Sequence, residues 1–391
     1  MKRKADIVII GGGVNGLSTA YNLAKKKKFG KIIVIEKSYI GSGASGRNAG
    51  GIRAQYSSTP NILLANKSLK MAEKISGELN FNIMFRQSGY LYIAKDELEL
   101  NWLKNDVKLQ NSLGVKSRIL SPEEILEEVP VIKIDGIIGG SFHQQAGIAR
   151  HDGVVWGYAK EAKKLGVEIK QFTEVIDLDL KNDEIKAVIT KKEKIETETV
   201  VNAAGAHSKE LAKKVGVELP ITPVKREILV TESLKPFLDP MVIDLKTDSY
   251  WNQTDRGELV AQHKHAITKD EESTVSTKST FSMLKTISRN TVKIFPQTKN
   301  VNVLRQWAGT YDMTPDGSPI LGEVSKVKGF IQANGFSGAG FKLSFAIGEL
   351  LAELIETKRS PEILKPFNYE RFEKGELILE REAGEIKHQN K

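Results

Sequence analysis

The segment that most constrains the fold spans residues 6–37, where an apolar run leads into a glycine-rich turn. The run, Ile7–Ile10, is typical of a buried parallel strand. The turn after it has the spacing Gly-x-Gly-x-x-Gly, with its glycines at Gly11, Gly13 and Gly16. In such a unit the first glycine permits a tight turn, the second lets a pyrophosphate approach the backbone, and the third lets helix and strand pack closely. The segment therefore predicts a Rossmann-like dinucleotide site.

The acidic residue that such a site needs follows at the expected distance. A second apolar run, Ile32–Ile35, ends in Glu36, 20 residues beyond the last glycine of the turn. A carboxylate at this place can accept hydrogen bonds from the ribose hydroxyls of an adenosine. The predicted helix between the two strands offers its N-terminus to the pyrophosphate. The motif alone does not distinguish NAD from FAD.

Composition narrows the class of protein further. The 391 residues are 40% hydrophobic and 27% charged, which suits a globular chain of two or three lobes at about 150 residues each. Absence of cysteine excludes disulfides, thiolate metal sites and a cysteinyl link to a flavin. The net charge of +9 comes largely from scattered lysines, so we expect no nucleic-acid binding. No metal site is expected either. Because the first apolar run belongs to the nucleotide fold, and no run is long enough to span a membrane, we expect a cytoplasmic protein.

The order of predicted elements indicates an α/β chain of two interleaved domains. A Rossmann-like domain is expected from residues 1–80, 141–220 and 305–375, a smaller α+β domain on an antiparallel sheet from 81–140 and 221–304, and a C-terminal tail from 376–391. One strand is predicted over 196–201, running into the small residues of Asn202-Ala-Ala-Gly-Ala-His-Ser. There Ala204 and Gly205 would allow a second close approach of backbone to ligand.

A second glycine-rich turn follows a predicted strand near the C-terminus. Gly335, Gly338 and Gly340 crowd this turn, Ser337 lies within it, and a helix is predicted to begin near Phe341. A helix N-terminus at this place could stabilise the negative charge of a reduced flavin at N1 and the C2 carbonyl. A phosphate loop or a plain tight turn is the alternative.

Four blocks of the sequence resemble the flavoenzymes that oxidise glycine, D-amino acids and N-substituted amino acids such as sarcosine. The blocks are GGGVNG with Glu36, and residues 41–56, 200–208 and 307–342, in the order that the family has them. The family's cofactor is FAD. The resemblance implies that the 41–56 loop reaches under the flavin, that 329–342 cradles its pyrimidine end, and that the antiparallel domain binds the substrate.

The resemblance also implies the residues that contact FAD. They are Gly11, Gly13, Gly16, Glu36, Lys37, Ser45, Arg47, Asn48, Ala49, Gly50, Val175, Ala204, Gly205, Gly309, Gly335, Ser337, Gly338, Gly340, Phe341 and Lys342. Gly309 stands where monomeric sarcosine oxidases have the cysteine that binds FAD covalently. FAD is therefore expected to be non-covalent here.

Three residues are expected to act on the substrate. Lys342 matches the lysine that binds the substrate carboxylate in monomeric sarcosine oxidases, and Tyr311 matches a substrate-site tyrosine. Arg53 is a candidate to position flavin or substrate. A surface lysine and a loop-bracing arginine are the plainer alternatives. The implied reaction is oxidation of a C–N bond, in which the neutral amine delivers a hydride equivalent to flavin N5 and the imine is hydrolysed.

His151 raises the question of a second flavin. The string from Ala146 to Trp156 resembles the β subunit of heterotetrameric sarcosine oxidase, whose matching histidine carries covalent FMN at the interface with a larger α subunit. Dye-linked proline dehydrogenases also hold FMN between two such subunits. His151 is therefore a candidate FMN contact, although a capping histidine is the simpler interpretation. The rival functions are a self-sufficient glycine or D-amino acid oxidase without a partner or FMN, and an electron-transfer subunit without turnover. A homo-oligomer is the alternative to assembly with a larger α-type subunit.

Overall fold

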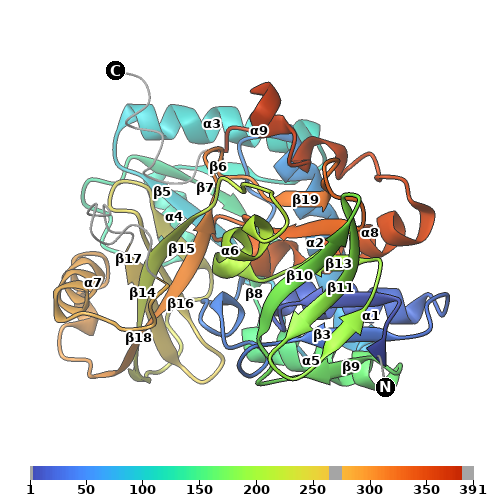
Figure 1. Ribbon diagram of the computed structural model, residues 1–391. Coiled ribbons are helices and arrows are strands. Elements are labelled where there is room, and N and C mark those ends of the chain that lie inside the picture. The colour runs from blue at the N-terminus through green and yellow to red at the C-terminus, as the bar shows by residue number, and fades with distance from the viewer. Residues whose placement is uncertain (1–2, 264–274, 381–391) are drawn as a thin grey trace.

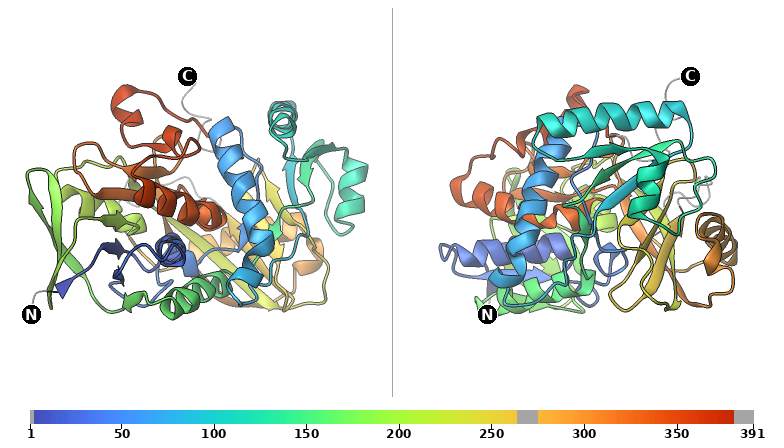
Figure 2. Two further views of the ribbon diagram at one scale, coloured as in Figure 1. Left: turned by 90° about the vertical axis from the view of Figure 1, so that its right-hand side faces the viewer. Right: turned by 180° about the vertical axis from the view of Figure 1, so that it is seen from behind.

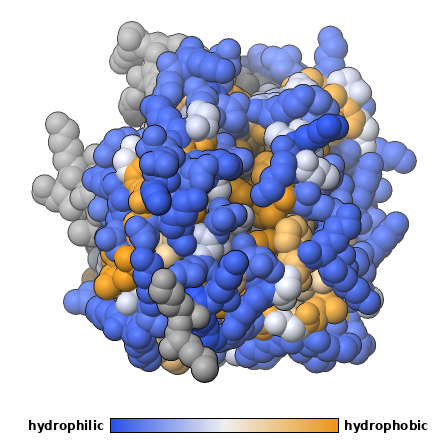
Figure 3. All heavy atoms as spheres, turned by 45° about the vertical axis from the view of Figure 1, so that its right-hand side comes forward, coloured by the Kyte–Doolittle hydropathy of each residue, from blue (hydrophilic) through white to orange (hydrophobic). Residues whose placement is uncertain are grey.

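The computed structural model describes residues 3–263 and 275–380, whose strands form four sheets. Figure 1 shows an eight-stranded sheet on the left and a six-stranded and a four-stranded sheet on the right. Most of the face shown in Figure 3 is hydrophilic, with apolar side chains gathered in a band across its middle. No helix in these two ranges has the length and apolar character needed to cross a membrane.

The six-stranded sheet has the order β19-β20-β13-β2-β3-β9, and all its neighbouring strands are parallel except β19 and β20. Its central strands β2 (Ile7–Ile10) and β3 (Ile32–Ile35) are buried along their whole length. Alternate side chains of these strands enter two different hydrophobic cores, one on each face. Burial on both faces explains the continuous apolar runs of the sequence. The other strands are β9 (Glu168–Lys170), β13 (Val200–Asn202), β19 (Ile320–Glu323) and β20 (Phe330–Asn334).

Helices cover one face of this sheet and the four-stranded sheet covers the other. The helices of the first face are α1 (Val14–Lys25), α2 (Thr59–Glu78), α5 (His151–Lys164) and α8 (Gly340–Thr357). The four-stranded sheet consists of β1 (Arg3–Lys4), β12 (Lys194–Glu196), β11 (Glu184–Thr190) and β10 (Val175–Lys181). Its β10–β11 hairpin turns through Asn182 and Asp183, both at positive φ, as a two-residue hairpin requires.

The prediction of one strand over residues 196–201 is wrong. The chain leaves the four-stranded sheet at Glu196 and enters the six-stranded sheet at Val200. Between them the Thr197 hydroxyl donates to the Thr199 carbonyl and accepts from the Thr199 N–H. These local bonds replace the ladder bonds of a continuous strand, which is how threonine commonly competes with sheet pairing.

The eight-stranded sheet has the order β18-β14-β17-β16-β15-β5-β7-β6. A hydrophobic core beneath α4 (Pro122–Glu128) and α7 (Phe281–Ile294) covers one of its faces. Its strands are β5 (Tyr90–Ala94), β6 (Arg118–Leu120), β7 (Gly139–His143), β14 (Thr222–Ser233), β15 (Met241–Asp244), β16 (Ser249–Gln253), β17 (Glu258–His263) and β18 (Val303–Met313). The domain boundaries expected from the sequence remain a prediction, but residues 305–313, expected in the Rossmann-like part, pair along β14 in this sheet.

The remaining elements connect these layers. Figure 2 shows α2 between α8 and the side of the molecule that carries the eight-stranded sheet. Residues 376–380 of the expected tail pack on the turn after β18, with Ile378 and Glu380 buried, and the rest of that tail lies outside the described residues. The shorter elements are β4 (Gly51–Ile52), β8 (Gly147–Ile148), α3 (Glu97–Ser112), α4 (Pro122–Glu128), α6 (Ser208–Lys213), α7 (Phe281–Ile294), α9 (Arg371–Lys374) and the 3-10 turns η1 (Ala44–Gly46), η2 (Gly205–His207), η3 (Pro296–Thr298) and η4 (Lys365–Phe367).

Candidate cofactor and active site

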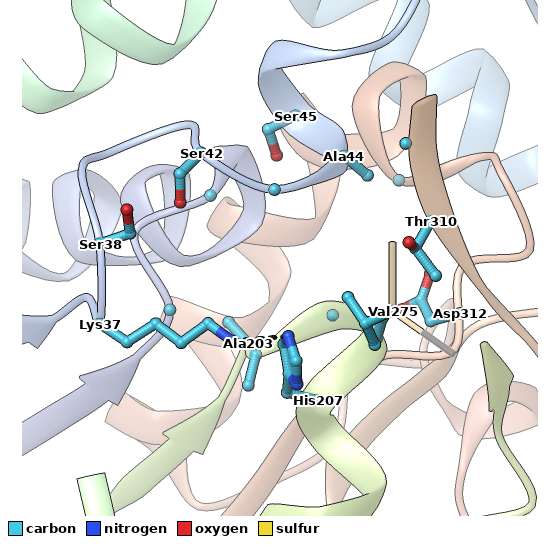
Figure 4. A pocket seen from close by; sticks show the side chains of 18 of the residues that line it. Lys37, Ser38, Ser42, Ala44, Ser45, Ala203, His207, Val275, Thr310 and Asp312 are labelled. Carbon is cyan, nitrogen blue, oxygen red and sulfur yellow. Dashed lines mark hydrogen bonds between the residues drawn. The ribbon is translucent and has the colours of Figure 1, made fainter. Parts of the chain in front are cut away.

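A cavity of about 700 Å³ lies where the carboxyl ends of β2, β3 and β13 face β14 and β18 of the eight-stranded sheet. This volume is within the range of small-molecule sites. Figure 4 shows side chains entering it from several segments, with Lys37 and His207 at one end and Thr310 and Asp312 towards the other. The carboxyl edge of a parallel sheet is where open α/β folds bind their ligands.

The glycine-rich turn after β2 serves both packing and access. Gly11 has φ +118°, and a Cβ on it would lie 2.1 Å from the carbonyl oxygen of Ala203. A Cβ on Gly16 would lie 2.1 Å from the carbonyl oxygen of Gly11, so this glycine allows α1 to meet the turn closely. Gly11 and Gly13 line the cavity, whereas Gly16 lies behind it. The geometry agrees with the tight turn expected at Gly11 and the close packing expected at Gly16, and the approach of a pyrophosphate to Gly13 stays a prediction.

The N-terminus of α1 opens into the cavity beside the loop of residues 41–50. The Val14 N–H donates to the Ser45 hydroxyl at 2.9 Å. Asn48 donates to the Ser45 carbonyl at 2.7 Å and accepts from the Gly50 N–H at 2.8 Å, and Arg47 donates to the Ser42 carbonyl. Ser45, Arg47 and Asn48 therefore both line the cavity and hold the loop. Ala49 and Gly50 are not among its lining residues.

Glu36 and Lys37, which directly follow β3, also line the cavity. One carboxylate oxygen of Glu36 accepts from the Gly12 N–H and the other from the Ser38 N–H, each at 2.8 Å. The Ser42 hydroxyl also donates to Glu36 Oε1, at 3.4 Å. Oε2 keeps a second lone pair that a ribose hydroxyl could use. Lys37 Nζ lies 2.6 Å from His207 Nε2, and burial, with the Lys37 charge, lowers the pKa of His207. Val175, Ala204 and Gly205 complete this wall.

The second glycine-rich turn joins β20 to α8 and closes the cavity at its far end. Gly335, Ser337 and Gly338 all have positive φ. Asp312 Oδ2 accepts from the Gly335 N–H at 2.8 Å. Burial raises the pKa of the Asp312 carboxyl to about 6, although backbone donors in the turn oppose that rise. Gly338, Gly340 and Phe341 line the cavity, so a second helix N-terminus faces it, whereas Gly335 and Ser337 are not among the lining residues.

Of the three residues expected at the substrate, Tyr311 alone is among those that line the described cavity. A Cβ on Gly338 would lie 2.5 Å from the Tyr311 ring, so this glycine lets the ring rest on the turn. The half-buried Lys342 lies in the first turn of α8, where its carbonyl accepts from the Ser68 hydroxyl. Lys342 is not among the residues that line the cavity, and its role at the substrate stays a prediction.

Arg53 lies among aromatic rings rather than on the cavity wall. Its guanidinium is 4.2 Å from the ring centroid of Tyr56, 5.6 Å from that of Tyr92 and 6.0 Å from that of Tyr90. It also donates to the Gln55 carbonyl. Burial acts to lower the pKa of Arg53, but the three tyrosines outweigh burial and raise it. The plainer interpretation of Arg53, a brace for its own loop, fits these contacts.

His151 is the first residue of α5, whose N-terminus packs against η1. It is not among the residues that line the cavity. Burial lowers the pKa of His151, although the neighbouring Asp152 opposes this effect. His151 therefore lies behind the 41–50 loop. Trp156, on the same helix, is 51% exposed.

Sequence analysis did not single out several polar residues that line the cavity, among them Arg226, Gln262, Asp312 and His207. His207 lies within a block that was quoted for its small residues, and Asp312 directly follows Tyr311. Both could have been found from their neighbours. Arg226 and Gln262 lie on alternating strands without a local motif, and only the pairing of β14 with β17 and β18 brings them to the cavity.

The residues present fit a dinucleotide that carries a large ring system. One end of the cavity has the glycine turn, a helix N-terminus and Glu36, and the other end has a second helix N-terminus with Tyr311 and Asp312. Fold and site thus define a dinucleotide-binding protein of the α/β class. The sequence profile of the DAO family, described as FAD dependent oxidoreductase, matches residues 6–354. The chain belongs to this family.

Individual relatives cover nearly the full length of the chain. It is 32% identical to the sarcosine oxidase subunit beta of Rhodobacter capsulatus, over 99% of this chain and 93% of the relative. The crystal structure of L-proline dehydrogenase from P. horikoshii is similar with a TM-score of 0.90 and 35% identity, over 96% of this chain and 100% of that one. Glycine oxidase from Geobacillus kaustophilus follows with a TM-score of 0.86 and 25% identity, over 94% and 99%.

Proposed function

We propose that this chain oxidises the C–N bond of a small amino acid or N-substituted amino acid, of the sarcosine or proline type, and that it is the β-type subunit of a larger assembly. The observation that carries the proposal is the single cavity that joins the Gly11–Glu36 end to Tyr311 on the eight-stranded sheet. Such a cavity can hold a cofactor and leave a substrate between its ring system and the sheet. The likeness to a sarcosine oxidase subunit, a proline dehydrogenase and a glycine oxidase supports the substrate class.

The described residues divide between the two halves of FAD. The turn at Gly11–Gly13 and the N-terminus of α1 would hold the pyrophosphate, Glu36 the adenosine ribose, and the turn at Gly338–Gly340 the pyrimidine edge of the flavin. Gly309 lines the cavity without a side chain, which supports non-covalent FAD. Bound flavin would supply a two-electron acceptor for the hydride equivalent of the amine.

The chain's own contribution to the reaction is orientation and exclusion of water. Tyr311 is held by Gly338 on one side, and the Arg226 guanidinium lies 5.6 Å from its ring centroid. A substrate placed against this ring would be fixed with respect to both helix N-termini. Such positioning can supply a large part of a rate enhancement without a strong base.

FMN at a subunit interface belongs to the same proposal. His151 stands at the start of α5, and Trp156 on the same helix exposes half of its surface. An exposed tryptophan on the helix that begins at His151 suits a surface that a partner subunit covers. The expected cytoplasmic location is also part of this proposal.

A self-sufficient glycine or D-amino acid oxidase is the second candidate. It is favoured by the match to glycine oxidase over 99% of that chain, which leaves no part of that protein unaccounted for. An electron-transfer subunit without turnover is the third candidate, although a cavity that reaches Tyr311 favours an enzyme over it.

A substrate-reduction screen separates these functions. The chain is purified alone and together with any subunit that co-purifies with it. Each preparation is mixed under anaerobic conditions with sarcosine, L-proline, glycine or D-alanine, and the loss of flavin absorbance is recorded. Bleaching by a secondary amino acid supports the proposal, and bleaching by glycine or D-alanine in the single chain supports the second candidate. No bleaching by any of them overturns both. Flavin fluorescence that stays with the acid-precipitated chain would show a covalent link, which His151→Ala should remove.

A further inference from the structure

The inner face of the eight-stranded sheet carries an arginine at the cavity. Arg226 on β14 lies opposite Gly309 of β18. Two residues further along β14, Ile228 lies opposite Gln262 of β17. All four line the cavity. Because cross-strand partners point to the same face, Arg226 and the Gly309 position face the cavity together. A Cβ on Gly309 would lie 3.3 Å from the Arg47 Cβ, so the 41–50 loop lies close to this position. Arg226 is only 3% exposed, so its cation lies within the molecule.

Arg226 differs in position from the other cations of the cavity. Four lysine and arginine side chains line it among the described residues: Lys37, Arg47, Lys214 and Arg226. Lys37 and Lys214 lie with His207 and Glu210 at the nucleotide end, and Arg47 is bound to its own loop. Arg226 comes from the sheet that faces them. Within this set it is the cation that a substrate against Tyr311 would meet.

The neighbours of Arg226 along β14 point to the other side of the sheet. Lys225 Nζ pairs with Glu227 Oε1 at 3.1 Å. Glu227 also accepts from the Thr280 N–H and from Gln306, at 2.7 and 2.9 Å. The charge of Glu227 is thus directed to the segment before α7, whereas Arg226 faces the cavity. Because successive side chains of a strand point to opposite faces, Arg226 faces the cavity while Lys225 and Glu227 face away from it.

We propose that Arg226 binds the carboxylate of the substrate and thereby restricts the enzyme to amino acids rather than simple amines; this inference rests on the proposed function above. A guanidinium presents two parallel N–H donors, which match the two oxygens of a carboxylate. The ring of Tyr311, 5.6 Å from the guanidinium, would pack against the carbon skeleton of the same molecule. In this arrangement Arg226 replaces Lys342 as the main carboxylate partner.

The inference is tested by binding of two planar compounds that cannot be oxidised as the substrate is. Pyrrole-2-carboxylate carries the anion, and pyrrole-2-carboxamide has the same shape without it. Their dissociation constants are measured from the flavin absorbance of the holoenzyme and by calorimetry, in the wild type and in Arg226→Gln, Arg226→Lys and Lys225→Gln. Lys225 is the matched control, because it is a cation on the same strand that points away from the cavity.

We expect Arg226→Gln to weaken the carboxylate about 10- to 100-fold, as for loss of hydrogen bonds to a charged group, and to leave the carboxamide unchanged. Lys225→Gln should bind both compounds as the wild type does. Unchanged carboxylate affinity in Arg226→Gln, an equal loss for both compounds, or a wild type that binds neither would overturn the inference. If Arg226→Gln does not retain FAD, Arg226→Lys decides: we expect roughly a 3- to 10-fold weaker carboxylate because the planar fork is lost, and unchanged affinity overturns the inference.

Failure of this inference is distinct from failure of the proposed function. Oxidation of an amino acid with affinity that depends on Lys342 but not on Arg226 would remove the arginine and leave the enzyme. Binding of the carboxylate through Arg226, without reduction of the flavin by any amine, would remove the proposed reaction and leave the carboxylate site.

Discussion

Lys37 Nζ lies 2.6 Å from Nε2 of His207, so the histidine offers a lone pair to an ammonium at one end of the cavity. Protonation of that nitrogen would set two cations against each other. This contact joins Lys37, in the segment that follows β3, to the turn after β13, two segments that the sequence separates by 170 positions. It therefore ties two walls of the candidate adenosine site together in a manner that depends on pH.

The first prediction concerns acid stability. Burial, and next the charge of Lys37, lower the pKa of His207 below its ordinary 6.5. The unfolded chain then binds more protons than the folded one, so the stabilising contribution is complete above pH 6.5 and is lost as pH falls below it. We expect His207→Gln to lose less stability than the wild type between pH 7.5 and 5.5, measured by urea unfolding. Parallel losses in both proteins would contradict the prediction.

The second prediction concerns the buried ion pair between Arg371 and Asp316. Arg371 and Asp316 form a fully buried ion pair, with Nε 2.7 Å from Oδ2, and the Ile378 N–H also donates to Asp316. Removing one partner leaves the other charge buried, so Arg371→Ala should cost roughly 3–5 kcal/mol in the free energy of unfolding. Lys326→Ala, which breaks only an exposed pair, is the control and should have a much smaller effect. Equal effects in urea unfolding would refute the argument.

The third prediction separates backbone strain from contact at the second glycine turn. Gly338 and Gly166 have φ of +88° and +93°, but a Cβ on Gly338 would lie 2.5 Å from the Tyr311 ring, whereas one on Gly166 meets nothing within 4 Å. Alanine at either place bears the cost of a left-handed conformation, about 1–2 kcal/mol. We expect Gly338→Ala alone to displace Tyr311 and to weaken ligand binding in the cavity. Similar ligand dissociation constants in both variants would show that the ring contact has no effect.

Local patterns of the sequence predicted the elements that depend on neighbouring residues. The glycine-rich turn expected after the first strand is present. The hairpin turn at Asn182–Asp183 and the capped start of α4 at Ser121 have equally local signals in the sequence. In each case the signal is a turn or cap whose geometry a few adjacent residues determine. The same holds for the start of α8 at Gly340.

Features that depend on long-range pairing could not be predicted in this way. The break at Thr197–Thr199 depends on two sheets that lie one above the other, and the place of β18 depends on its pairing with β14. Arg226 and Gln262 reach the cavity only through that pairing. Lys342 and Arg53 were placed by family resemblance, which indicates the segment but not the direction of a side chain.

The last prediction concerns Asp312, which holds the second glycine turn through the Gly335 N–H. Burial raises the pKa of its carboxyl from 3.8 to about 6, so the folded chain holds a proton that the unfolded chain has already lost. Stability from this group is complete below pH 3.8 and is lost as pH rises through 6.

Asparagine resembles the protonated acid and cannot ionise. Asp312→Asn should therefore gain stability relative to the wild type as pH rises from 4 to 7, by an amount approaching roughly 3 kcal/mol at 1.36 kcal/mol per pKa unit. Urea unfolding of both proteins at pH 4, 5, 6 and 7 measures this difference. Asp179→Asn, on β10 with a side chain that is 39% exposed, is the control. A difference that does not change with pH would mean that Asp312 is already ionised throughout, and that the turn is held by a permanent negative charge.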